Sequence, residues 1–395
     1  MPQEWPVVRV LQVAAFPFPS PQGSQVYVAG MARALARRGH EVTLACYAHG
    51  VGEPDPSLRM LRAPPWPGYG NLRAGPDRVK PLLDLALGAR LWRRRGEGAW
   101  DIVHAHNVEA PILAWPAAAA LGAPLVYNAH TLLGAELPLY LHGAAARRAG
   151  AALGGVVDRA LPRLVQAAVV LSEEAEAAMR RGGCPEVELI PPGVDAADLD
   201  GANPARARER WGLGEGPWVA YAGNPDVYQD LPVLVRAVAE LHARGIPDAP
   251  GLLMISASPM TDLEAMAAPI PAARRRFIQA DTWADVRDLL ACAQLAASPR
   301  GSCPGFPIKL LNTLGLGLPT VCAPGSARDI AGVVRAPHAE FGEVILGLCR
   351  DRARREALGR AAAADVRERF TWEASAVRLE GLYERLRSTF RAGVG

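Results

Sequence analysis

Short apolar segments alternate with helical segments along this chain, and the alternation starts afresh near its middle. The first series has strand-like segments at 7–13, 41–47, 101–105, 125–128, 168–171 and 187–190. The second series has them at 218–222, 252–255, 295–297 and 319–322. Buried strands separated by helices predict parallel sheets with helices on both faces. The chain is therefore expected to be an α/β protein with two doubly wound, Rossmann-like domains.

A segment rich in proline, glycine and aspartate, residues 191–216, separates the two series and marks the expected boundary. We place an N-terminal domain at 1–192 and a C-terminal domain at 193–371. Long helices are predicted at 338–370 and 372–390. Ligands of such folds bind beside the carboxyl ends of the strands, so two facing sheets would leave a binding cleft between them.

Composition excludes several classes of protein. The 43 basic and 40 acidic residues give a net charge of +3, too balanced for a nucleic-acid binder. The 6 cysteines include no CxxC pair, which argues against a zinc site or a disulfide framework and fits the cytoplasm. Residues 110–129 are uncharged but contain Pro111, Pro116 and Pro124, so we predict a helix, a turn and a strand instead of a membrane span.

Several motifs occur in order between residues 9 and 385. They are Pro21-Gln-Gly-Ser, Asp101-Ile-Val-His-Ala-His-Asn, Val126-Tyr-Asn-Ala-His, Ile190-Pro-Pro-Gly-Val-Asp and Gly305-Phe-Pro-Ile-Lys-Leu-Leu. Together they resemble the family-4 glycosyltransferases of GT-B fold. The resemblance implies retaining transfer from a nucleotide-sugar (UDP- or GDP-linked) to an acceptor glycan, lipid or small molecule. It also implies no metal or other cofactor, and a C-terminal helix, 372–395, that returns to the first domain.

In the first domain the resemblance assigns His106 and Asn107 to the acceptor side of the cleft and His130 to the reacting sugar or acceptor. Thr131 takes the place of an aspartate that often follows this histidine, so a structural role for His130 stays open. His104 and His106 face the same way on a strand, but no third metal ligand accompanies them. His104 is expected to be buried and hydrogen-bonded. Gly23 either admits the donor phosphate to a helix N-terminus or serves only a tight turn.

The second domain departs from the family pattern at the donor site. Asn224 and Gln229 stand where the family has arginine and lysine, and Pro304 and Asn312 replace two glutamates. Either catalysis is lost, or a variant branch holds the diphosphate with Arg300 and Lys309. We favour the second, because a lysine is rare in this chain and a compact ammonium suits a tight loop. Asn312 would then lie near the ribose.

Two further functions stay open, a non-catalytic GT-B binding subunit and a nucleotide-sugar 2-epimerase on the same fold. A basic stretch, Arg90 and 93–95 with Trp92, is either a solvated helix face or a peripheral contact with an anionic membrane.

Overall fold

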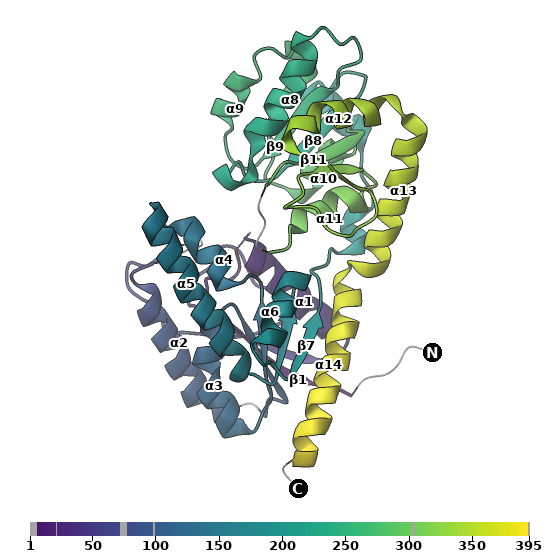
Figure 1. The fold of residues 1–395 in the computed structure, drawn as a ribbon. Coiled ribbons are helices and arrows are strands. Elements are labelled where there is room, and N and C mark those ends of the chain that lie inside the picture. Colours follow the sequence, from purple (N-terminus) through teal and green to yellow (C-terminus); the bar gives the residue numbers. More distant parts are fainter. Residues whose placement is uncertain (1–5, 21, 72–76, 98, 302–304, 394–395) are drawn as a thin grey trace. The chain divides into compact units, whose positions relative to one another are not determined.

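The computed structural model describes residues 6–20, 22–71, 77–97, 99–301 and 305–393. Its contacts divide the chain into two compact units. The first unit contains the described residues up to 193, residues 305–306 and those from 372 onward; the second contains 194–301 and 307–371. Each unit is a parallel sheet flanked by helices (Figure 1).

In the first unit, seven described strands form a parallel sheet with the order β3-β2-β1-β4-β5-β6-β7. These strands are β1 (Arg9–Ala14), β2 (Glu41–Cys46), β3 (Arg59–Arg62), β4 (Ile102–His106), β5 (Leu125–Ala129), β6 (Ala167–Val170) and β7 (Glu186–Leu189). The helices are α1 (Gly23–Arg37), α2 (Lys80–Arg94), α3 (Glu109–Leu121), α4 (Leu133–Glu136), α5 (Ala144–Ala160), α6 (Glu173–Arg181) and α14 (Trp372–Gly393).

In the second unit, six described strands form a parallel sheet with the order β10-β9-β8-β11-β12-β13. They are β8 (Trp218–Ala222), β9 (Gly251–Ser256), β10 (Arg275–Gln279), β11 (Leu295–Ser298), β12 (Thr320–Cys322) and β13 (Val333–Arg335). The helices are α7 (Pro204–Trp211), α8 (Leu231–Ala243), α9 (Thr261–Met266), α10 (Trp283–Leu290), α11 (Ile308–Gly315), α12 (Phe341–Arg350) and α13 (Arg352–Arg369).

The two faces of the first sheet differ in chemistry. Leu11 and Val13 point into a large apolar core that α2, α3 and α6 share. The opposite face carries buried polar side chains, because Gln12 lies beside His104 and His106 lies beside Asn128 in the parallel register. Side chains alternate between faces along a strand, so one register sets both the apolar core and this polar layer.

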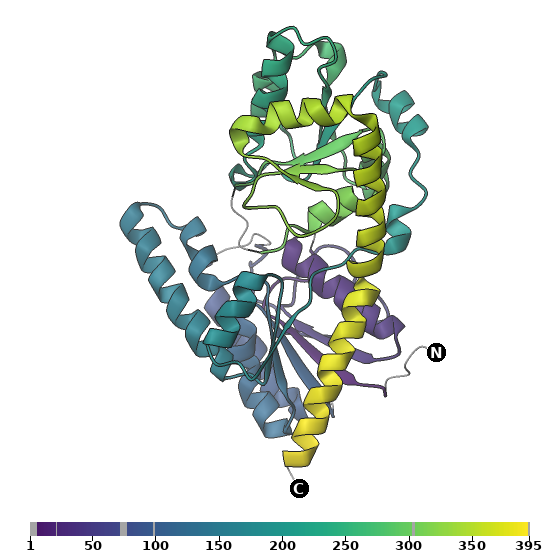
Figure 2. The same ribbon diagram turned by 45° about the vertical axis from the view of Figure 1, so that its right-hand side comes forward.

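The C-terminal helix α14 packs on the first unit, where it covers the polar layer together with α1 (Figure 2). A Cβ atom at Gly30 of α1 would overlap the indole ring of Trp372. Glu380 is 2% exposed and accepts hydrogen bonds from Arg38 Nε at 2.6 Å and Nη2 at 2.8 Å. Its Oε1 also lies 2.8 Å from His40 Nε2, so the buried carboxylate is fully engaged.

Most predicted elements are present within a few residues of their expected bounds. Residues 110–129 form most of α3 and then β5, as predicted. None of the described helices is both long and apolar enough to cross a membrane. The prediction of a single helix at 338–370 was wrong. It is interrupted at Asp351, whose carboxylate accepts a hydrogen bond at 2.9 Å from the backbone N–H of Arg354 and thereby caps a new helix, α13.

Candidate functional site

Three histidines of the first unit form a buried chain at the carboxyl ends of β4 and β5. The imidazole rings of His104 and His106 are stacked, with centroids 4.6 Å apart. His106 Nδ1 lies 3.3 Å from His130 Nε2, a hydrogen bond whose donor depends on the tautomers. The side chains of His104 and His106 have no exposed surface, whereas His130 is 7% exposed. Of the three, His130 is therefore the one that faces outward.

Burial keeps these histidines neutral. It lowers the pKa of His104 to about 3 and that of His130 to about 3. It also lowers the pKa of His106 well below its ordinary value, and its two histidine neighbours add to this effect. At neutral pH these side chains act as hydrogen-bond donors and acceptors and carry no charge. The ring of Tyr27 meets His130 edge-on with centroids 4.8 Å apart and holds the outer imidazole in place.

The expectation that His104 is fully hydrogen-bonded holds for one ring nitrogen only. His104 Nδ1 lies 2.6 Å from the hydroxyl of Tyr383 on α14. Its Nε2 has no hydrogen-bond partner among the described residues, nor do the side-chain amides of Gln12 and Asn128. The polar layer beneath the histidine chain is thus only partly satisfied, which is costly inside a fold.

The two other predicted residues of the first unit lie in loops. Asn107 follows β4 with φ of 64°, a left-handed conformation that asparagine tolerates better than most residues. Its N–H donates to the backbone oxygen of Asn128 at 3.3 Å. Gly23 is the first residue of α1, and a Cβ atom there would meet nothing within 4 Å. The space beside this helix N-terminus is open.

In the second unit, the predicted donor residues gather beyond the carboxyl ends of the neighbouring strands β8 and β11. Asn224 lies at the centre of the group. Its side-chain oxygen accepts hydrogen bonds from Lys309 Nζ and, at 3.1 Å, from Gln229 Nε2. Its Nδ2 donates to Asp226 and, at 3.1 Å, to the hydroxyl of Tyr228. Asn224 and Gln229 therefore orient the ammonium group instead of supplying charge themselves.

Two cations border this group. The Arg300 guanidinium lies over the ring of Tyr228, 4.7 Å from its centroid, and Lys309 Nζ lies 5.9 Å from the ring centroid of Tyr221. Lys309 as a whole is exposed, but protein atoms crowd its ammonium group. This desolvation, against a raising effect of Asp226, lowers the pKa of Lys309 to about 8. The ammonium is thus poorly solvated and well placed to gain from an anionic ligand.

Asn312 lies one turn after Lys309 on α11 and is partly exposed. Pro304 lies outside the described residues. The sequence reasoning did not identify Tyr221 and Asp226 as part of the donor group. Tyr221 could have been noticed as the one hydroxyl-bearing side chain in the strand Trp218–Ala222.

A polar cluster around the other lysine of the chain, Lys80, lies in the first unit and was also not predicted. Lys80 Nζ is 3.2 Å from Asp84 and 3.0 Å from Glu109, and it donates to the backbone oxygen of Ala15 at 3.3 Å. The hydroxyl of Tyr47 donates to Asp84 at 2.5 Å. Burial raises the pKa of Asp84. Both lysines of the chain are therefore fixed in polar clusters rather than extended into solvent.

Comparisons with known proteins agree with this architecture. The sequence profile described as Glycosyltransferase Family 4 matches residues 21–198. A D-inositol 3-phosphate glycosyltransferase of Xylanimonas cellulosilytica is 30% identical, with 96% of each chain covered. One from Mycobacterium marinum is 29% identical over 94% of this chain and 83% of the relative.

Solved structures show the same fold at lower identity. A sucrose-phosphate synthase from Thermosynechococcus elongatus has a TM-score of 0.77 at 18% identity and covers 97% of this chain and 100% of its own. Anabaena HepE in complex with UDP and glucose has a TM-score of 0.71 at 14% identity and covers 96% of this chain and 100% of its own.

Proposed function

This chain is a glycosyltransferase that belongs to family 4 and has the GT-B fold, and from that premise we propose that its donor is a nucleotide-diphosphate sugar, UDP- or GDP-linked. The sugar is transferred to an acceptor glycan, lipid or small molecule with retention of anomeric configuration. No metal takes part. In this proposal the second unit binds the donor and the first unit binds the acceptor.

The observation that carries the proposal is the pair of cations beside Asn224. A diphosphate has about two negative charges, and charge-assisted hydrogen bonds to lysine and arginine compensate such charges best. Lys309 is held by Asn224, and Arg300 lies over the ring of Tyr228. These two side chains take over the role of the family residues that Asn224 and Gln229 replace. Solved complexes of Anabaena HepE with UDP and with UDP-glucose support a uridine nucleotide as the first donor to test.

Electrostatic stabilisation of the leaving diphosphate supplies most of the catalysis in this proposal. Lys309 and Arg300 oppose the charge that develops as the glycosidic bond breaks. The neutral imidazole of His130 hydrogen-bonds a hydroxyl of the reacting sugar or of the acceptor, and Asn107 lines the acceptor side. His106 acts through His130, because it is buried and its Nδ1 bonds to His130 Nε2. We therefore regard His106 as a positioning residue.

The names of the sequence relatives suggest which acceptor to test first. Both relatives described above are D-inositol 3-phosphate glycosyltransferases. A small polyol phosphate is accordingly the first candidate, followed by lipid-linked and glycan acceptors. We place the reaction in the cytoplasm, with a peripheral contact at the inner membrane face through α2, where Leu85 is 66% and Trp92 45% exposed.

The test incubates the full chain with UDP- and GDP-sugars and a panel of acceptors, and identifies products by mass spectrometry and anomeric configuration by NMR. We expect a product with the donor's anomeric configuration, and its formation should fall in Lys309→Ala but not in Arg360→Ala. Arg360 is an exposed cation on α13 of the same unit and is the matched control.

The replaced donor residues favour a second candidate, a binding subunit without catalysis. Donor binding by calorimetry without turnover on any acceptor would support it and contradict the proposal. Epimerisation of the donor sugar in the absence of acceptor would instead support the 2-epimerase alternative.

A further inference from the structure

A cavity of about 180 Å³ lies in the first unit between α2 and the edge of the sheet. Its lining includes Thr43 of β2, Arg59 of β3, Arg90 and Arg94 of α2, and Trp100. Thr43 and Arg59 are paired in the parallel register of β2 and the edge strand β3. Arg90 and Arg94 are four residues apart and so project from the same face of α2. The basic stretch identified in the sequence is therefore divided, and two of its arginines line this cavity.

The described residues that line the cavity include three arginines and no carboxylate. Several other arginines of this unit are paired with carboxylates, among them Arg9 with Asp101 at 3.0 Å, Arg38 with Glu380 at 2.6 Å and Arg385 with Glu186 at 2.6 Å. Neither Arg59 nor Arg90 forms an ion pair with a described residue. Arg90 Nε is moreover buried without a hydrogen-bond partner among them.

Such an arrangement is unfavourable without a ligand. Guanidinium groups are always charged, and Arg59 and Arg90 line the same cavity with no carboxylate among its described lining residues, so their charges are unbalanced there. A buried donor without a partner adds a further cost. An anion that enters the cavity removes both costs, whereas a neutral acceptor satisfies the buried donor but leaves the positive charges unbalanced.

We propose that this cavity is a binding site for a phosphate group, either free or as a small phosphomonoester. Arginine forks match the oxygen atoms of phosphate, and several arginines suit a dianion with more than two acceptor oxygens. The indole of Trp100 offers an apolar wall for a short substituent. The volume is below the ~300 Å³ at which drug-sized ligand pockets begin, so a whole nucleotide-sugar is excluded.

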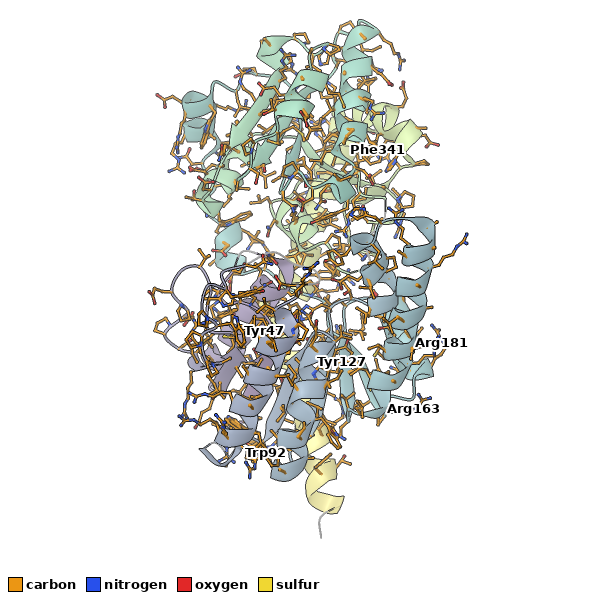
Figure 3. All side chains as sticks on the ribbon, turned by 90° about the vertical axis from the view of Figure 1, so that its left-hand side faces the viewer. Tyr47, Trp92, Tyr127, Arg163, Arg181 and Phe341 are labelled. Atoms are coloured by element: carbon orange, nitrogen blue, oxygen red, sulfur yellow. The ribbon has the colours of Figure 1, made fainter. Side chains whose placement is uncertain are left out.

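This site goes beyond the transfer reaction proposed above. The histidine chain lies at the carboxyl ends of β4 and β5, whereas Arg59 is the first residue of β3 and Trp100 precedes β4. Figure 3 shows Trp92, in the last turn of α2, well apart from Tyr47, which follows the carboxyl end of β2. A ligand held by Arg59 and Arg90 is therefore a second ligand of the first unit.

The phosphate could belong to a soluble compound or to a lipid headgroup, and the experiment distinguishes these sources. Binding of inorganic phosphate to the full chain is measured by calorimetry, and binding to vesicles of phosphatidylcholine with or without phosphatidic acid is measured by co-sedimentation. The variants are Arg59→Gln, Arg59→Gln with Arg90→Gln, and Arg148→Gln as the control. Arg148 is exposed on α5 of the same unit. Lys309→Gln is a second comparison: it would lose phosphate binding if the phosphate bound at the donor site of the second unit instead.

We expect the double variant to weaken phosphate binding at least tenfold while Arg148→Gln leaves it unchanged. The double variant can instead weaken binding to phosphatidic-acid vesicles while inorganic phosphate does not bind. In that case the site takes a lipid headgroup, which also supports the proposal. Should the double variant fail to fold, Arg59→Gln alone must weaken binding, since Arg59 lies exposed on an edge strand. Unchanged binding of both probes in a folded variant, or a loss seen only in Lys309→Gln, would overturn the proposal.

Discussion

The side chain of Lys309 occupies the space that a Cβ atom would take at position 223, so any larger residue there would displace the end of the lysine chain. Gly223 directly follows β8 and has φ of 152°, and Lys309 lies in the first turn of α11. The close approach lets the ammonium reach Asn224, the next residue. A glycine and a lysine far apart in the sequence thus define the charged centre of the proposed donor site.

Replacing this glycine should displace the lysine. In Gly223→Ala the new methyl group would clash with the lysine chain, and we expect donor affinity to fall about tenfold or more, the scale of a lost charge-assisted hydrogen bond. Calorimetry with UDP measures this. Gly347→Ala is the control, because that glycine lies in α12 and a Cβ atom there meets nothing within 4 Å. Equal affinity of the two variants would show that Lys309 is not positioned by Gly223.

Removal of the ammonium should weaken donor binding directly. For Lys309→Ala we expect a loss of ~1.5–3 kcal/mol in binding free energy, the value of a hydrogen bond to a charged group. Lys309→Arg should also bind less well, because a planar fork does not replace a point charge in a crowded loop. Titration calorimetry with the nucleotide-sugar measures both. Wild-type affinity in both variants would place the diphosphate elsewhere and favour the non-catalytic alternative.

Donor binding should also depend on pH. Because desolvation lowers the pKa of Lys309 to about 8, the free protein loses this charge as the pH rises through that value. Affinity should be constant between about pH 6 and 7 and fall above pH 8, by at most ~10-fold per pH unit for one proton. Lys309→Arg keeps its charge, so its weaker binding should be independent of pH over this range. A decline of the same size in the arginine variant would assign the titration to another group.

His130→Ala should lower turnover by ~10²-fold or more with little change in donor affinity, if His130 contacts the reacting sugar or acceptor. Because burial lowers the pKa of His130 to about 3, its imidazole should not contribute an ionisation to the rate profile between pH 5 and 8. Steady-state kinetics on the wild type and the variant measure both. Unchanged turnover in a correctly folded variant would assign His130 a purely structural role.

The buried histidines should make the first unit sensitive to acid. The pKa of His104 is lowered to about 3, against ~6.5 in an unfolded chain. Between these values the unfolded chain binds a proton that the folded chain does not. Stability is therefore present above about pH 6.5 and lost as the pH falls, by up to ~1.4 kcal/mol per pH unit for each such histidine. Urea unfolding at pH 7 and pH 5 should show a smaller loss for His104→Gln than for the wild type. His142→Gln, which removes an exposed imidazole, is the control.

Local sequence patterns were enough to predict the order of the central strands and helices. Strands such as Trp218–Ala222 are apolar throughout because they are buried on both faces, and this composition is visible in the sequence. The strands that were missed are short and lie away from the sheet centre. Among them, β3 and β10 begin with arginine, so no apolar run marks them.

Parts of both candidate sites could be predicted as well. Lys309 was identified because lysine is rare in this chain, Arg300 as the second cation of the variant donor site, and His130 through the family resemblance of the strand end on which it lies. What could not be predicted is which side chains orient them. The hydrogen bond from Lys309 to Asn224 joins segments that follow different strands, and it has no local sequence signal.

The sequence by itself determined where strands and helices form, because helical and strand periodicities are properties of neighbouring residues. It also determined that Lys309, one of the few lysines of the chain, is an unusual residue at a loop-to-helix junction. Only the tertiary structure decided that Tyr383 of the last helix meets His104, that three arginines share one cavity, and that Gly223 admits Lys309. The physical reason is that strand register and helix packing bring together side chains far apart in the chain, and no local pattern encodes those distances.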